Sequence, residues 1–158
     1  MYRRDIAKGA GGLISYFSTA VPSKRLKLPK TYRTLEAIAC SIGRKEILFL
    51  ALYRPPKQAR GNTGSKYMQN VQEEMNDLCQ WACHQKQTIV VLGDLNMDRL
   101  NPDRGEGKIL RDLEEVYNLS CLITELTRVT MHSQTLLDML LTNTQSCSKT
   151  AGCTTRDK

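Results

Sequence analysis

Two polar residues follow a short apolar run near the middle of the chain, and their types suit metal-assisted phosphate chemistry. Residues 88–92 are all apolar or β-branched, as expected of a short buried strand, and Gly93 ends the run. Asp94 and Asn96 follow directly. Mg²⁺ prefers carboxylate oxygens and keeps several waters for a phosphate substrate. The segment therefore predicts a metal ligand and a hydrogen-bond donor at the end of a strand.

Further polar residues fall at places where other predicted strands end. They are Tyr53 with Arg54, Thr127 with Arg128, and Ser133 with Asp138. Ligand sites on sheets are commonly assembled from strand ends, so we expect these groups to converge. Asp138 stands in an apolar run, where a charge is costly unless it is paired, so we expect a partner such as a histidine or a lysine.

Chemical roles can be assigned to these side chains, but each also has an ordinary structural alternative. Asp94 could orient or deprotonate a water, while Asn96 and Tyr53 could donate hydrogen bonds to a phosphate. Asp94 and Asn96 are also good turn formers. Tyr53 could be a packed aromatic residue, and Asp138 could cap a turn. The order and spacing of the set favour a site more than any single member does.

Composition and charge narrow the class of protein. The chain has 158 residues, one domain's worth, with a formal net charge of +7. A basic balance makes a polyanion a plausible partner, nucleic acid first. We expect no membrane association, because no apolar run approaches the roughly 20 residues of a membrane span. Nor is there an export signal, so we expect an intracellular protein with free thiols, nuclear if it acts on DNA.

One group of cysteines resembles a metal site only superficially. Cys79 and Cys83 lie four residues apart on a predicted helix, next to His84. Structural zinc sites usually combine two close pairs of ligands, and no second pair lies nearby. We therefore interpret these three residues, and His132, as ordinary side chains.

The hydrophobic pattern predicts a mixed sheet with two helices, in an α/β or α+β arrangement. Strands are expected at 13–17, 35–42, 47–53, 88–93, 119–124 and 135–142, and helices at 66–86 and 108–117. Turns or loops are expected at 9–12, 19–34, 54–64 and 101–107. The domain should cover residues 1–143, followed by a disordered tail at 144–158, which is polar and aperiodic.

Taken in order, the motifs resemble those of a known family. Gly-Gly-Leu-Ile at 11–14, Leu-Tyr-Arg-Pro-Pro at 52–56 and Val-Val-Leu-Gly-Asp-Leu-Asn at 90–96 are followed by Leu-Thr-Arg-Val-Thr at 126–130 and Ser-Gln-Thr-Leu-Leu-Asp at 133–138. This succession is similar to the endonuclease/exonuclease/phosphatase superfamily. Within it, the closest resemblance is to the endonuclease domains of non-LTR (LINE-type, jockey-like) retrotransposons, over roughly residues 9–143.

The resemblance implies a four-layered α/β sandwich and a Mg²⁺- or Mn²⁺-dependent phosphodiesterase that nicks DNA beside a reverse transcriptase domain. Asp94 would orient the nucleophilic water and contact the metal. Asn96 and Tyr53 would contact the scissile phosphate, and Asp138 would bind the catalytic histidine. The implied substrate contacts are Arg54, Arg128, Ser133 and Thr135.

Two departures from the family pattern bear on activity. Family members have an early strand pair that ends in an asparagine and a metal-binding glutamate, and no such pair precedes Gly9. They also end in a Ser-Asp-His motif, whereas no histidine follows Asp138. We therefore expect a partial domain, inactive or impaired, with weakened metal binding. The alternatives are a remnant that binds nucleic acid without cleaving it and, ranked lower, a phosphatase of the same superfamily.

Overall fold

A six-stranded sheet organises the chain, with the strand order β3-β4-β5-β6-β10-β7. The computed structural model describes residues 1–4, 12–44, 47–56, 64–85, 88–103, 105–131 and 134–144. The six strands are Ser23–Leu26 (β3), Glu36–Ile42 (β4), Ile47–Tyr53 (β5), Thr88–Asp94 (β6), Asp138–Thr142 (β10) and Ser120–Cys121 (β7). Only β5 and β6 pair in parallel, and the other neighbours are antiparallel. The predicted mixed α/β class is confirmed.

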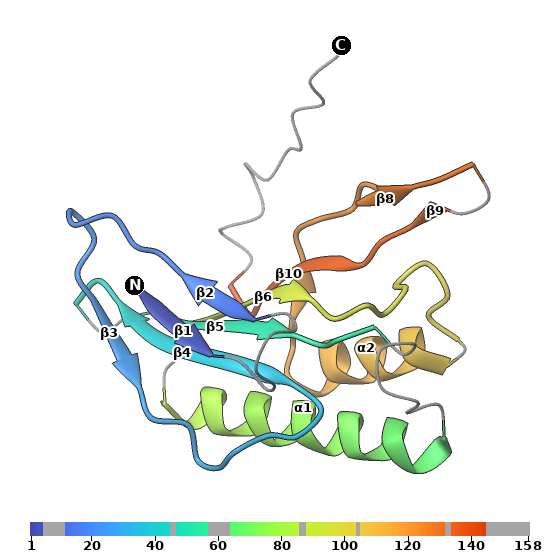
Figure 1. Cartoon of the computed structure of the whole chain (residues 1–158), viewed down its shortest axis with the longest axis horizontal. Coiled ribbons are helices and arrows are strands. Elements are labelled where there is room, and N and C mark those ends of the chain that lie inside the picture. Colours follow the sequence, from blue (N-terminus) through green and yellow to red (C-terminus); the bar gives the residue numbers. More distant parts are fainter. Residues whose placement is uncertain are drawn as a thin grey trace.

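Two helices, α1 (Ser65–Gln85) and α2 (Gly105–Val116), cover one face of this sheet (Figure 1). The crossover through α1 makes β5 and β6 parallel, because parallel neighbours need a long connection. Both helices bury most of the apolar residues that the sequence predicts to face inward, which are Val71, Met75, Leu78 and Ala82 on α1 and Ile109, Leu110 and Leu113 on α2. Met68 is partly buried, and Val116, which is also predicted to face inward, is 69% exposed at the end of α2. Among the described residues, no helix combines the length and apolar character needed to cross a membrane.

The opposite face of the sheet carries a small hairpin of β1 (Tyr2–Arg4) and β2 (Leu13–Ser15), which lies over β4 and β5 (Figure 1). A second, smaller core forms there around Ile38, Cys40 and Ala51. Phe17 meets Phe49 edge to face, with ring centroids 6.0 Å apart. Of the four layers that the resemblance implies, the described residues therefore show a helix layer, the main sheet and this two-stranded sheet.

Several predicted boundaries are wrong, mostly where the sequence has no clear periodicity. Residues 19–34, predicted as a loop, contain the edge strand β3, whose charged Lys24 and Arg25 suit a sheet edge. The predicted strand at 135–142 is divided between β10 and a separate hairpin of β8 (Arg128–Val129) and β9 (Gln134–Thr135). The predicted turn at 9–12, the loop at 54–64 and the tail at 144–158 lie mostly outside the described residues.

Glu74 on α1 clamps the start of β4 to the helix layer. Its carboxylate accepts hydrogen bonds from the backbone N–H groups of Arg33 and Thr34, both at 2.9 Å, and from the Thr34 hydroxyl at 2.6 Å. Because these bonds end on a charged acceptor, we expect Glu74→Ala to lower the free energy of unfolding by about 2 kcal/mol. Urea denaturation measures this. The exposed neighbour Glu73→Ala should change it by less than about 0.5 kcal/mol, and equal losses in the two variants would contradict the clamp.

Candidate functional site

Three of the predicted site residues stand in one row across adjacent strands. Tyr53 on β5 pairs with Asp94 on β6, which in turn pairs with Asp138 on β10. Residues in direct register project from the same face of a sheet, with Cα atoms about 4.5–5.5 Å apart in an antiparallel pair. The three side chains therefore share one face, the one opposite the helices. We call Tyr53, Asp94, Asp138 and the nearby Asn96 the rim.

A tight turn after β6 places Asn96 beside Asp94. The Asn96 backbone N–H donates to the Asp94 carboxylate, with the nitrogen 2.8 Å from Oδ1. Asn96 has a φ of 49°, a left-handed conformation that asparagine tolerates better than most residues. Its Nδ2 donates to the Arg54 carbonyl oxygen at 2.8 Å.

Arg54, predicted as a substrate contact, lies inside the protein beneath this turn. Its side chain is fully buried. The guanidinium donates to the carbonyl oxygens of Leu95 and Asn96, both at 2.6 Å, and to the carboxylate of Glu106 at 2.6 Å. The structure therefore places Arg54 behind the rim, where it holds the backbone that carries Asn96.

Asp138 does not have the buried surroundings that its apolar sequence neighbours predict. It is exposed at the start of β10, so water solvates its carboxylate and the predicted need for a partner is wrong. Thr127, predicted with Arg128 as one of the strand-end groups that converge at the site, supports the backbone there. Its hydroxyl accepts hydrogen bonds from the backbone N–H groups of Leu137 at 3.0 Å and Asp138 at 3.2 Å. Thr127 thus fixes the backbone where Asp138 enters the rim.

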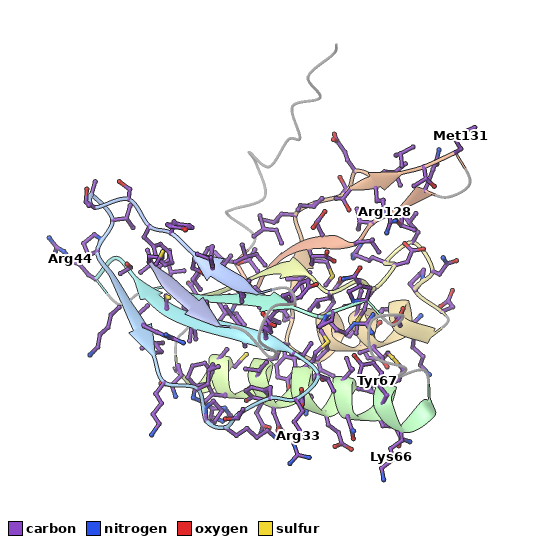
Figure 2. All side chains as sticks on the ribbon, in the orientation of Figure 1. Arg33, Arg44, Lys66, Tyr67, Arg128 and Met131 are labelled. Atoms are coloured by element: carbon purple, nitrogen blue, oxygen red, sulfur yellow. The ribbon has the colours of Figure 1, made fainter. Side chains whose placement is uncertain are left out.

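The β8–β9 hairpin brings a positive charge to this edge of the sheet. Arg128 lies on β8, is exposed and pairs with Thr135 on β9 (Figure 2). Thr135 is half-buried, and its hydroxyl has no hydrogen-bond partner among the described residues. Ser133 and His132 lie outside the described residues. Arg128 is thus an exposed cation whose charge lowers the pKa of Asp94.

The surroundings of Asp94 raise the pKa of its carboxyl group. Burial raises its pKa, and the hydrogen bond from the Asn96 backbone opposes this. The neighbouring Asp138 carboxylate raises the pKa further, whereas Arg54 and Arg128 lower it. The net effect is a raised pKa for Asp94. A carboxylate with a raised pKa accepts a proton more readily than an ordinary surface aspartate, which suits a group that activates water.

This shift predicts a pH-dependent gain of stability in Asp94→Asn. Because the folded pKa is raised above the unfolded value, ionisation of Asp94 opposes folding, and this penalty is absent below about pH 4 and grows as pH rises through the folded pKa. Asparagine keeps the Oδ1 acceptor but cannot ionise. We expect its Tm to exceed the wild type's at pH 7 and to match it at about pH 3. Scanning calorimetry measures these Tm values, and Glu125→Gln, which removes an exposed charge, is the control. A Tm of Asp94→Asn below that of the wild type at pH 7 would contradict the prediction.

The donor set at the rim fits a hard divalent cation bound mainly by water. Asp94 and Asp138 are neighbouring carboxylates that repel each other, and a cation between them would relieve this repulsion. Within the described ranges, no group of three or more histidine, cysteine, aspartate or glutamate side chains is arranged to hold a metal ion. A cation here would therefore have at most two carboxylates of the described residues, which predicts weak binding.

Comparisons with known proteins add little to this geometry. No protein-family model matches the chain, and none of the curated proteins matches it. Among solved structures, the chain is similar to an endonuclease/exonuclease/phosphatase family protein from Leptotrichia buccalis C-1013-b, with a TM-score of 0.38 and 13% sequence identity. The matched region covers 80% of this chain and 50% of that one, so the chain spans about half of that protein's length.

Proposed function

We propose that the rim is a phosphodiester-binding site that supports slow, Mg²⁺-dependent nicking of DNA, as in the endonuclease of a non-LTR retrotransposon. The observation that carries this proposal is the row of Tyr53, Asp94 and Asp138 across three adjacent strands, with Asn96 beside it. A phenol and two carboxylates on one face, with an amide in the adjoining turn, match what binding a phosphate and activating a water require.

Each residue of the rim has a distinct task in this proposal. Asp94, with its raised pKa, orients the attacking water and accepts its proton. Asn96 and Tyr53 donate hydrogen bonds to phosphate oxygens, and the exposed Arg128 attracts the DNA backbone. A bound Mg²⁺ would stabilise the charge that develops on the phosphate. Asp138 would share the cation with Asp94. The reaction should be slow, because the described residues place neither a histidine nor a third carboxylate ligand at the rim.

Conversion of supercoiled plasmid to the open circle tests the proposal. We expect slow conversion by the wild type in Mg²⁺ or Mn²⁺ and none in EDTA. Glu125→Gln, which changes an exposed charge, should nick as the wild type does. The proposal fails if the plasmid stays supercoiled at high protein concentration, or if conversion persists in EDTA.

A second candidate function is binding of nucleic acid without cleavage. It is favoured by the net charge of +7 and by the basic residues around β3, which are Lys24, Arg25, Lys27, Lys30 and Arg33. Contacts with phosphates release counterions, so the affinity for a short duplex should fall steeply between low and high salt. Salt-sensitive binding in fluorescence anisotropy, with no nicking, would favour this candidate.

A further inference from the structure

We infer that Arg54 and Glu106 are positioning residues that hold the Asp94–Asn96 turn in its working shape from beneath. This inference deepens the proposed function and rests on it for its chemical meaning. Neither residue needs to touch a ligand. The buried guanidinium instead ties together the end of β5, the turn after β6 and the first turn of α2.

Arg54 bonds to all three residues of the turn. Its backbone N–H donates to the Asp94 carbonyl at 3.0 Å, and its guanidinium donates to the carbonyls of Leu95 and Asn96 at 2.6 Å each. In return, the Asn96 side chain donates to the Arg54 carbonyl at 2.8 Å. Four hydrogen bonds between one residue and three consecutive ones fix both ends of the turn.

The turn needs the hydrogen bonds from Arg54 because the backbone conformation of Asn96 is unfavourable by itself. Asn96 has a φ of 49°, and a non-glycine residue in this region persists only where the surroundings hold it. Its backbone N–H is aimed at the Asp94 carboxylate. Relaxation of Asn96 toward negative φ would swing its carbonyl and its side chain, both of which bond to Arg54. The same movement would displace the amide donor of the rim relative to Asp94.

Glu106 is what allows a charged guanidinium to sit in this position. The Arg54 side chain is 0% exposed and that of Glu106 is 18% exposed, with 2.6 Å between Nη2 and Oε1. A buried cation without an anionic partner is strongly unfavourable. Glu106 lies in the first turn of α2, where the helix dipole favours an acidic side chain. The start of α2 therefore supplies the negative charge of Glu106, which stabilises the buried Arg54 guanidinium beneath the turn.

The start of α2 packs closely against the chain that follows the turn. Gly107 packs so closely that a Cβ there would lie 2.1 Å from the Asn101 carbonyl oxygen and 3.0 Å from that of Asp98. This contact sets the position of Glu106.

A lysine in place of Arg54 would keep the charge but lacks the planar guanidinium, which reaches two carbonyls and a carboxylate together.

Glu106→Gln tests the inference with Glu114→Gln as its matched control. Glu114 also lies on α2 and also accepts hydrogen bonds from an arginine, Arg99, at 2.8 Å each, but these bonds do not involve residues 94–96. We expect Glu106→Gln to speed hydrogen exchange of the Asn96 backbone N–H about tenfold. Glu114→Gln should leave this exchange rate unchanged. The nicking rate at saturating plasmid should fall about tenfold in Glu106→Gln alone. Arg54→Lys should reproduce the effect of Glu106→Gln and serves if that variant does not fold.

The two readouts separate this inference from the proposed function. Unchanged Asn96 exchange in Glu106→Gln and Arg54→Lys, or an equal rise in Glu114→Gln, would overturn the positioning role. A wild type that does not nick would refute the proposed function instead. In that case faster Asn96 exchange confined to the Arg54 and Glu106 variants would still support their hold on the turn.

Discussion

Gly93→Ala is expected to lower the free energy of unfolding by more than about 3 kcal/mol, enough for the variant to accumulate unfolded. Gly93 has a φ of 148°, a conformation that residues with a side chain rarely adopt. A Cβ at this position would lie 1.7 Å from the Leu52 carbonyl oxygen and 2.7 Å from its carbon. These are backbone atoms of β5, so the alanine could be admitted only by separating β5 from β6.

Gly43→Ala is the matched control, and urea denaturation measures both variants. Gly43 also has a positive φ, of 68°, but nothing lies within 4 Å of a Cβ placed there. It should therefore lose only the conformational term, about 1 kcal/mol. Similar losses in the two variants would show that β5 and β6 do not approach as closely as the structure has them. The result bears on the site, because Tyr53 and Asp94 follow Leu52 and Gly93 directly.

Asp94→Asn is expected to reduce the nicking rate by about 100-fold or more, while DNA affinity changes by less than about threefold. Asparagine preserves the size of the side chain and the acceptor for the Asn96 N–H, but it removes the base and one charge that would bind the cation. The variant should thus be more stable than the wild type at neutral pH and much less active. A stable protein with lost activity cannot be explained by misfolding.

Plasmid conversion and anisotropy on the same preparations measure these two quantities. Asp112→Asn, a carboxylate on α2 away from the rim, serves as the control and should retain the wild-type rate. Nicking by Asp94→Asn at the wild-type rate would remove Asp94 from the chemistry. Equal losses in Asp94→Asn and Asp112→Asn would point to a general effect of charge on DNA binding.

The sequence alone predicts the row of strand-end residues well, because the row depends on local patterns. The apolar runs 47–53 and 88–93 and the helix between them specify two neighbouring parallel strands, so their ends had to meet. The stripe on α1, such as Val71, Met75 and Leu78, is buried as its 3.6-residue period predicts.

What lies behind the rim could not be predicted in the same way, because it depends on contacts distant in sequence. An arginine after a strand end looks like a surface charge, and its partner Glu106 lies 52 residues away. The apolar pattern predicts a second helix that starts at residue 108 and a loop at Glu106, whereas α2 begins at Gly105. For Asp138, the sequence predicts burial where the structure shows exposure. Its apolar neighbours suggested burial, but it sits at the first position of β10, which is open to solvent.

Binding of Mn²⁺ observed by NMR tests the central claim, that the rim holds a divalent cation beside a phosphate site. Paramagnetic Mn²⁺ broadens the resonances of nuclei close to it. At low Mn²⁺ concentration we expect selective broadening of the backbone amides of Tyr53, Asp94, Asn96 and Asp138, and its loss in Asp94→Asn. Excess Mg²⁺ should reverse the broadening. Broadening centred on another acidic group, such as Glu73 and Asp77 on α1, with the rim amides unaffected, would contradict the account.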